Sequence, residues 1–177
     1  MSILVDQTHS RVKIEGSEYV IEAIVRNMMS GETNSGLMGT FLPIPTLIEV
    51  LLPDEIFSWQ EEHWGAMWGD YDTKIVERNY GSVVIDFWSW FDPLFIGLEK
   101  LSAMFPTVTL RGSYTQLRYT MVGTYAIRDG ELLFHERHTS DDDSNLEEMM
   151  CEWSNGGKEK WIQFSEKVLS TPGMAFV

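Results

Sequence analysis

The apolar positions of the first thirty residues follow two periods, which predict a strand followed by a helix. Residues 11–15 alternate polar and apolar side chains with a period of two, as a half-buried strand does, and the run ends at Gly16. The residues that then share one helical face are Val20, Ile21, Ile24 and Met28. Ser17 can cap the start of this helix and Gly31 can end it.

A second helix has the clearest pattern in the chain. Residues 83–88 are rich in β-branched and aromatic side chains and lead into Asp92-Pro93, an N-cap followed by a proline at the first helical position. The apolar residues that recur at helical spacing are Leu94, Leu98, Leu101 and Phe105. Three strand-like runs follow, at 107–114, 118–127 and 131–136. Asp129-Gly130 joins the last two, because both residues tolerate the positive φ of a tight hairpin.

Residues 32–72 show no such period, so we expect an irregular segment there, with a short helix after Pro53-Asp54. Near the C-terminus, residues 146–153 and 161–168 have apolar residues at helical spacing. The order of elements predicts an α+β fold: a ferredoxin-like (split βαβ) antiparallel sheet with both helices on one face, a long insertion after the first helix, and C-terminal helical additions.

The whole chain, residues 1–177, is expected to form a single domain. Its ferredoxin-like core would take residues 10–31 and 80–137, with an acidic, aromatic insertion at 32–79 and an acidic helical addition at 138–177. With 177 residues, of which 44% are hydrophobic and 12% aromatic, the chain can bury its own core. No apolar run approaches the ~18 residues of a membrane span. A lone cysteine, Cys151, and the lack of a secretory signal pattern favour a cytoplasmic location.

The acidic residues are concentrated in two parts of the chain. There are 27 Asp and Glu against 13 Lys and Arg, which gives a formal net charge of −14. Residues 27–73 contain eight acidic residues and no Lys or Arg, and residues 141–152 contain six acidic residues and again no Lys or Arg. This charge opposes direct binding to nucleic-acid phosphates or to an anionic membrane. The expected partner is therefore a protein with a basic surface.

Two sets of side chains are predicted to contact that partner. The acidic set is Glu49, Asp54, Glu55, Glu61, Glu62, Asp70, Asp72, Asp141, Asp142, Asp143, Glu147 and Glu148. The aromatic set is Trp59, Trp64, Trp68 and Tyr71. Packing onto the sheet is the more ordinary role for such aromatic residues, but the exposed edges of Trp and Tyr dominate interface hot spots. No catalytic residue is predicted, because the sequence has no nucleophile elbow, phosphate-binding glycine loop or zinc-protease motif.

Two groups of residues have the types of side chain that bind metals, and neither group is expected to form a metal site. The residues that match positions 1, 3, 5 and 12 of an EF-hand calcium loop are Asp141, Asp143, Asn145 and Glu152. Leu146 takes the position at which that loop needs glycine, so a solvated loop that caps the next helix is favoured. His135 and His138 would lie on opposite faces of a strand, which disfavours zinc. No metal and no cofactor is predicted.

Four motifs occur in order along the chain. They are FLPIP at 41–45, HWGAMWG at 63–69, IDFWSWFDP at 85–93 and LSAMFP at 101–106. In this combination the chain resembles the YubB-type ferredoxin-like domain family of phage and plasmid proteins, over about residues 11–136. The resemblance implies the ferredoxin-like fold and an origin in a mobile genetic element, and it transfers no active site.

These observations favour a phage-encoded, non-enzymatic interaction protein that binds a basic surface of a host or viral protein. It would inhibit a host defence or nucleic-acid-handling system of the restriction or CRISPR type, and in the boldest form its acids mimic the charges of DNA. One alternative is a nucleic-acid-binding accessory module that uses the open face of the sheet. Its basic and aromatic residues would be Arg111, Arg118, Arg128, Tyr114, Tyr119 and Tyr125.

A second alternative is an enzyme for a small substrate, with a pocket between the sheet and the insertion. A homo-oligomer formed through an edge strand is also open.

Overall fold

The helices and strands come from a computed structural model that describes residues 6–30, 36–49, 53–116, 121–139, 148–149, 152 and 159–170. In chain order they are β1 (Gln7–Glu15), α1 (Glu18–Ser30), α2 (Gly36–Phe41), α3 (Thr46–Glu49), α4 (Pro53–Trp64), β2 (Asp70–Asn79), β3 (Ser82–Trp90), α5 (Phe95–Met104), β4 (Thr109–Gln116), β5 (Met121–Arg128), β6 (Glu131–Thr139) and α7 (Glu159–Ser170).

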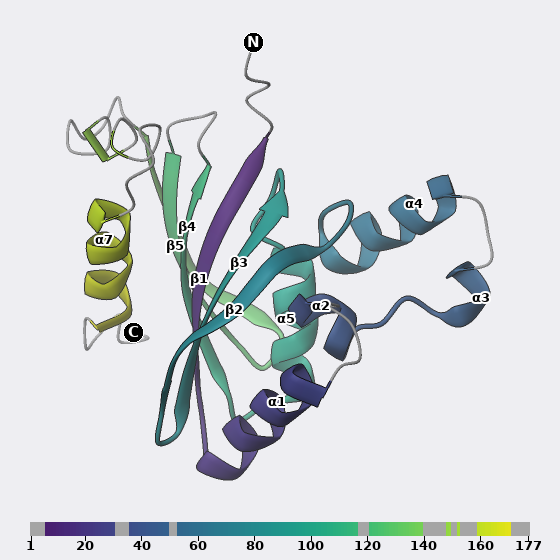
Figure 1. Ribbon diagram of the computed structural model, residues 1–177, viewed down its shortest axis with the longest axis horizontal. Coiled ribbons are helices and arrows are strands. Elements are labelled where there is room, and N and C mark those ends of the chain that lie inside the picture. The colour runs from purple at the N-terminus through teal and green to yellow at the C-terminus, as the bar shows by residue number, and fades with distance from the viewer. Residues whose placement is uncertain are drawn as a thin grey trace.

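The six strands β1 to β6 form one sheet in the order β2-β3-β1-β4-β5-β6, and every neighbouring pair is antiparallel. β1 lies between β3 and β4, so that Val12 has Ile85 on one side and Gly112 on the other. The sheet is strongly twisted, with β2 and β6 at its edges (Figure 1). An α+β fold with an open antiparallel sheet is therefore confirmed.

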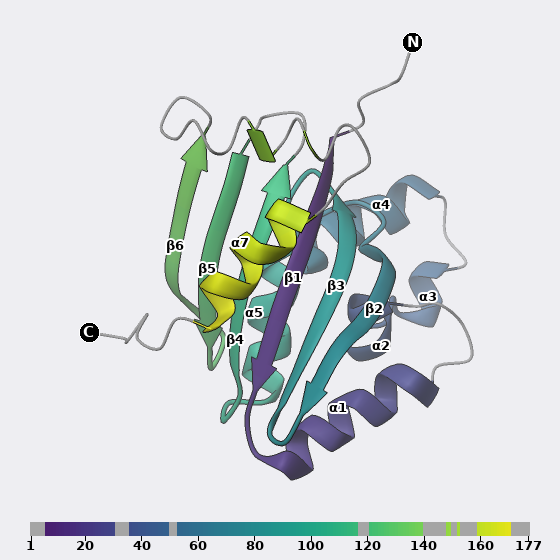
Figure 2. The same ribbon diagram turned by 60° about the vertical axis from the view of Figure 1, so that its left-hand side comes forward.

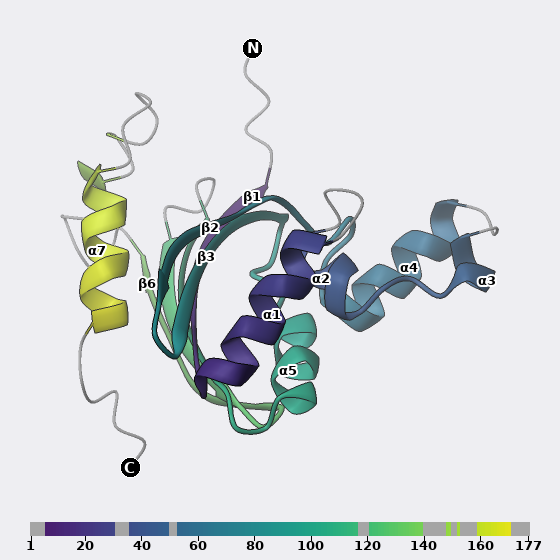
Figure 3. The ribbon, with the colours of Figure 1, turned by 60° about the horizontal axis from the view of Figure 1, so that its bottom comes forward.

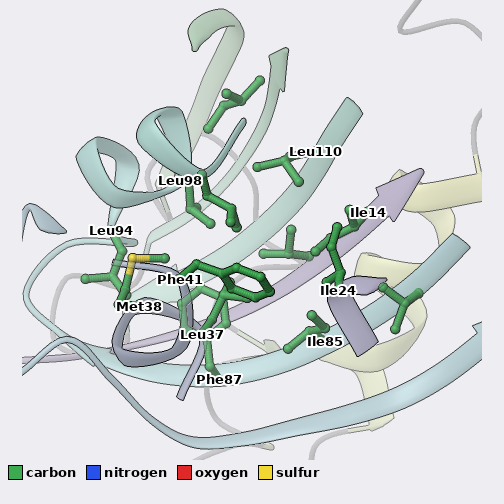
Figure 4. Packing of buried hydrophobic residues seen from close by; sticks show 14 of the residues in the cluster. Ile14, Ile24, Leu37, Met38, Phe41, Ile85, Phe87, Leu94, Leu98 and Leu110 are labelled. Atoms are coloured by element: carbon green, nitrogen blue, oxygen red, sulfur yellow. The ribbon is translucent and has the colours of Figure 1, made fainter. Parts of the chain in front are cut away.

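The main hydrophobic core lies between one face of the sheet and the helices α1, α2 and α5, which all cover that face (Figure 3). Alternate residues of the central strands point into it because side chains of a strand alternate between faces. Figure 4 shows Ile14, Ile85, Phe87 and Leu110 from the strands meeting Ile24, Leu37, Met38 and Leu98 from the helices. The first two predicted helices thus share one face of the sheet.

The opposite face carries α7, which crosses β1, β4 and β5 (Figure 2). A smaller buried cluster forms there from Val122, Met149 and Trp161, with Trp88 packed against it. The sheet is therefore covered on both faces over its middle strands, while β2 and β3 lie beside α7. In the described ranges, no helix combines the length and the apolar composition that a membrane crossing requires.

The main difference from the sequence-based expectation is β2, a strand that was not predicted: it begins within the segment expected to be irregular (32–72) and takes up the end of the predicted insertion (32–79). Its side chains alternate only between half-buried and exposed, and the half of the strand after Ile75 is exposed, because β2 is an edge strand. Polar residues such as Thr73 and Lys74 therefore replace the apolar ones by which a strand is recognised. The short helix expected after Pro53 is confirmed as α4.

The second predicted helix is confirmed as α5, but it begins later than expected. Leu94 occupies the N-cap position with a left-handed backbone (φ 63°), and no side chain caps the helix there. Asp92 and Pro93 therefore precede the helix. The hairpin at Asp129-Gly130 is confirmed, with φ of 50° and 78°. The helix stop at Gly31 and most of the helix predicted at 146–153 lie outside the described residues.

Candidate protein-interaction surface

The turn that links α4 to β2 holds Trp68 at the surface in a strained conformation. Gly65, Trp68 and Gly69 have φ of 88°, 67° and 62°, and the Trp68 side chain is 46% exposed. A non-glycine residue in the left-handed region costs roughly 1–2 kcal/mol. Such a backbone persists only when neighbouring contacts hold it, and these residues cluster at functional sites.

Contacts from α4 hold this turn. The buried amide of Gln60 accepts a hydrogen bond of 3.1 Å from the Trp68 N–H. The ring of Trp64 packs against Gly69 so closely that a Cβ at Gly69 would lie 2.6 Å from it. Trp64 is itself 5% exposed, and its indole N–H donates to the Leu42 carbonyl at 2.9 Å. The prediction that Trp64 contacts a partner is therefore wrong, because its side chain is buried to support the turn.

Trp59 also has neighbours within the chain. Its ring stacks on His63 with centroids 4.3 Å apart and meets Trp64 edge to face at 5.7 Å. The His63 Nδ1–H donates to the Trp59 carbonyl at 2.9 Å. Trp68 lies outside the helix, because α4 ends at Trp64. Packing is thus the main role of Trp59 and Trp64.

Trp68 belongs to a chain of four rings, each in contact with the next, which we call the aromatic patch: Phe57, Trp68, Trp90 and Tyr71. Trp68 meets Phe57 at 5.3 Å and Trp90 at 5.2 Å, both edge to face, and Tyr71 lies 6.2 Å from Trp90. Except for Trp68, these residues are half-buried. The patch therefore joins α4 to the ends of β2 and β3, and it offers one prominent exposed ring on a supported base.

Phe57 and Trp90 belong to this surface, although they were not expected there from the sequence. A signal for Trp90 was present, because the period of two along β3 places Asp86, Trp88 and Trp90 on the same face. For Phe57 the signal was weaker, since its contact with Trp68 depends on how the turn after α4 bends.

Exposed carboxylates border the aromatic patch on α4. Asp54 and Glu61 precede and follow Phe57 by three and four residues, so all three lie on one helical face. Glu55 and Glu62 are exposed on the next face of the same helix. Beside Tyr71, burial chiefly raises the pKa of the tyrosine hydroxyl, and the charge of Asp72 raises this pKa further. The patch is thus a neutral aromatic surface with an acidic border.

The remaining acids of the insertion have other surroundings. Asp72 is exposed and forms an ion pair of 2.7 Å with Lys74. Asp70 is buried and accepts hydrogen bonds from the N–H groups of Leu37 (2.5 Å) and Met38 (2.8 Å). The prediction that Asp70 binds a partner is therefore wrong, because it serves as the cap of α2. Glu49 lies in α3, and its side chain is outside the described residues.

The C-terminal acids are not joined to this surface in the residues the structure describes. Asp141, Asp142, Asp143 and Glu147 lie outside those residues. Glu148 is exposed and forms an ion pair with Lys160 on α7. Since α7 and α4 lie on opposite sides of the sheet (Figure 1), Glu148 is separated from the acids of α4.

The residues of the nucleic-acid alternative do not share a face. Tyr114 and Tyr125 are buried beneath α5, where their rings contact Phe95 at 5.9 and 5.0 Å. Arg111 lies on the opposite face, since it ion-pairs with Glu15 at 3.4 Å. Arg118 and Tyr119 are outside the described residues. The expected interleaving of basic and aromatic side chains is therefore not formed by the described members.

The two histidines of β6 lie on opposite faces, as the strand period predicts. His135 shares a hydrogen bond of 2.8 Å with the Tyr114 hydroxyl, and burial lowers the pKa of the imidazole. His138 lies opposite Val122 and 3.6 Å from Glu136. Among the described positions, no group of three His, Cys, Asp or Glu is arranged to hold a metal ion.

Comparisons with known proteins identify no family for this chain. No family model matches the chain, and no curated protein matches it. A solved structure, protein api92 from Yersinia pseudotuberculosis of the family model DUF1281, is similar with 17% sequence identity and a TM-score of 0.48. The likeness covers 57% of this chain and 39% of that chain. A likeness at this level carries no argument about fold or function, so the functional argument rests on the residues of this chain.

Proposed function

We propose that this chain is a non-enzymatic interaction protein that binds a basic surface of another protein through the aromatic patch and the acids of α4. The observation that carries the proposal is Trp68, an exposed indole held on a left-handed backbone by Gln60. Trp is enriched among interface hot spots, and strained backbone is retained where it serves a function. The acidic border supports a basic partner, because complementary charge steers association.

We further propose a ferredoxin-like assignment and a mobile-element origin. The spatial order β2-β3-β1-β4, with α1 and α5 on one face, is the order of a split βαβ arrangement, to which β5 and β6 are added. Together with the four sequence motifs, this supports a YubB-type protein of a phage or plasmid. Its partner would be a host or viral protein in the host cytoplasm, such as a component of a restriction, CRISPR or other nucleic-acid-handling system.

The DNA-mimic form of the proposal has less support. A mimic needs a continuous acidic stripe that follows the phosphates of a duplex. In the described residues, the acids of α4 and Glu148 lie on opposite sides of the sheet, so they do not make one stripe. We therefore limit the proposed surface to α4 and the aromatic patch.

The test compares Trp68→Asn with Tyr80→Asn in capture from a bacterial lysate, followed by measurement of Kd with the captured protein after purification. Asn tolerates the left-handed backbone at position 68, so Trp68→Asn removes the indole and its ring contacts without adding backbone strain. Tyr80 is 85% exposed and lies outside the patch, which makes it a matched control.

We expect Trp68→Asn to weaken the captured complex about thirtyfold and Tyr80→Asn to leave it unchanged. The captured protein should be basic, and Kd should rise with NaCl. Equal affinity of the wild type and Trp68→Asn for the same partner would contradict the proposal. Neutralising Asp54, Glu55, Glu61 and Glu62 together should slow association more than it speeds dissociation.

A further inference from the structure

A groove lies on the α7 side of the sheet. It has a volume of about 300 Å³, at the lower end of the range for small-ligand sites. Its apolar lining comes from Val76 on β2, Val84 on β3 and Ile162 on α7. Its charged lining is Arg11, Lys13, Glu77 and Glu166. The groove is thus bounded by the sheet, the edge strand β2 and α7.

Both cations of the groove already have carboxylate partners. Arg11 donates through Nε and Nη2 to the two oxygens of Asp86, at 2.6 and 2.8 Å, and through Nη1 to the Ser165 hydroxyl at 3.4 Å. This two-point pairing uses the guanidinium in a fixed geometry. The ammonium of Lys13 lies 2.9 Å from a carboxylate oxygen of Glu15. Because Arg11 and Lys13 are already paired with carboxylates, the groove is not expected to bind an anion.

The two carboxylates of the groove come from opposite walls, β2 and α7. Glu77 on β2 and Glu166 on α7 are both close enough to Arg11 for their charges to raise its pKa, after the larger contribution of Asp86. Glu77 accepts a hydrogen bond from the Asn79 side-chain amide through one oxygen only. Glu166 is exposed, and its carboxylate forms no hydrogen bond or ion pair with another described residue. Asp86 pairs with Arg11, and Glu15 is shared by Lys13 and Arg111. With Glu77 and Glu166 included, four carboxylates therefore face three cations in and beside the groove, which leaves a net negative charge.

We propose that this groove binds the guanidinium or ammonium group of one arginine or lysine side chain of the basic partner. The charged end would lie between Glu77 and Glu166, and the methylene stem would pack on Val76, Val84 and Ile162, as long cationic side chains pack on apolar surfaces. The inference rests on the proposed function, because the side chain belongs to the partner described there.

The positions of groove and patch on β3 support a single bound segment. Val84 lines the groove and Trp90 belongs to the aromatic patch, six residues further along the same strand. Both lie on the face of β3 toward α7, because residues at even spacing share a face. The distance along the strand is roughly 20 Å, which an extended segment of about six residues can span.

The test uses N-butylguanidinium as a probe for the cationic side chain, with N-butylurea as the neutral analogue. Binding is followed by the backbone amide NMR shifts of the full chain. The key variant is Glu77→Gln with Glu166→Gln, and the matched control is Glu159→Gln, an exposed acid on the same helix outside the groove. A probe of this size is expected to bind with a Kd on the order of 10 mM.

We expect shifts in β1, β3 and α7, an affinity about tenfold lower in the double variant, and an unchanged affinity in Glu159→Gln. N-butylurea should not bind. Equal probe affinity in the wild type and the double variant, or shifts confined to α4, would overturn the groove proposal.

The two proposals fail in different ways. Probe binding needs no partner, so a groove that binds the probe survives even if Trp68→Asn captures every protein that the wild type captures. Conversely, a captured partner whose Kd depends on Trp68 but is unchanged by Glu77→Gln with Glu166→Gln would overturn the groove as a partner site. It would leave the aromatic patch as the interaction surface.

Discussion

The carboxylate of Asp70 is surrounded by donors at the start of α2. Besides Leu37 and Met38, the Thr73 hydroxyl donates to it, while its burial raises its pKa above the usual value. Gly36, with φ of 65°, lies so close that a Cβ there would come within 2.3 Å of a carboxylate oxygen. A residue that looks in the sequence like part of an acidic surface is thus a fixed internal cap.

We predict that Asp70→Asn lowers the free energy of unfolding by about 1–3 kcal/mol. An amide offers one acceptor oxygen, and its NH₂ group would face backbone N–H donors. Asp72→Asn, two residues away and exposed, should change stability by less than about 0.5 kcal/mol. Urea unfolding of the two variants measures this difference. Equal effects of both substitutions would show that the cap contributes nothing.

The hydrogen bond between His135 and Tyr114 predicts a dependence of stability on pH. Burial chiefly, and then the charge of Arg137, lowers the pKa of His135, while burial raises the pKa of Tyr114 to about 12. The unfolded imidazole takes up a proton near about pH 6.5, before the folded one does. Stability is therefore highest above that pH and falls as the pH drops below it.

We expect His135→Gln to remove this part of the pH dependence. The difference in unfolding free energy between the wild type and the variant should be smaller at about pH 5.5 than at about pH 7.5, because only the wild type loses the contribution of a neutral His135. Thermal or urea unfolding at the two pH values checks it. A difference that grows on acidification would contradict the lowered pKa.

At the scale of elements, β4 and β5 fit together through two reciprocal glycine–tyrosine pairs. Gly112 lies opposite Tyr125, and Tyr114 lies opposite Gly123. A Cβ at Gly112 would come within 2.2 Å of the Tyr125 ring, and one at Gly123 within 2.3 Å of the Tyr114 ring. Each ring therefore occupies the space that a side chain on the neighbouring strand would take.

We predict that Gly112→Ala destabilises the protein by about 1–3 kcal/mol, because the added methyl overlaps the Tyr125 ring. The neighbouring Ser113→Ala is the control and should be neutral or slightly stabilising. Its hydroxyl is buried and has no hydrogen-bond partner among the described residues, so replacing it removes an unsatisfied group. Chemical unfolding of both variants measures the free energy of unfolding. A larger loss of this free energy in Ser113→Ala than in Gly112→Ala would contradict the packing of Tyr125 against Gly112.

α7 is anchored by Trp161, which is 1% exposed and donates its indole N–H to Nδ1 of His9 at 3.0 Å. Truncation in Trp161→Ala should cost about 3–5 kcal/mol, most of it in the docking of α7. The main core lies on the other face, so we expect faster hydrogen exchange of α7 amides with little change in α1 and α5. Gln163→Ala, exposed on α7, is the control. Uniformly faster exchange throughout the chain would show that α7 is not a separate unit.

The sequence predicts an element well where its pattern is decided within the element. Leu98 and Leu101 repeat at helical spacing, so α5 is recognisable, whereas β2 is not, because its partner strand and not its own side chains make it a strand. The groove could not be predicted from the sequence for a similar reason. The apolar stripe of α7 predicts a helix but not which face of the sheet it covers, and the groove exists only because α7 lies beside β3.

For the candidate surface, the sequence predicted the exposed acids of α4 but not which of the tryptophans would be exposed. The acids of α4 are exposed, as expected for carboxylates that lack a basic residue in the same segment. The fates of Trp64 and Trp68 differ although both lie in the same motif, because α4 ends between them and the turn directs one ring inward and the other outward. That choice depends on the positive φ at Gly65 and Gly69, which residue types permit but do not require.

At the scale of the whole molecule, the formal net charge is −14, so the carboxylates in excess repel one another and destabilise the folded state. Raising NaCl from about 20 mM to about 300 mM should therefore raise Tm by a few degrees. A variant with Asp54→Asn, Glu55→Gln, Glu61→Gln and Glu62→Gln should show a smaller increase. Differential scanning calorimetry measures both. An identical increase in the two proteins would mean that the acids of α4 do not contribute to the repulsion.

The central position of β1 has a consequence for how the protein is made. β1 leaves the ribosome before both of the strands with which it pairs, at residues 82–90 and 109–116, so neither of its edges can be completed early. At roughly 5–20 residues per second, about 100 residues of synthesis separate β1 from its second partner and take on the order of 10 s. During that time Val12 and Ile14 remain unpaired in the growing chain. A nascent-chain chaperone that shields an apolar strand would therefore act on this protein at β1.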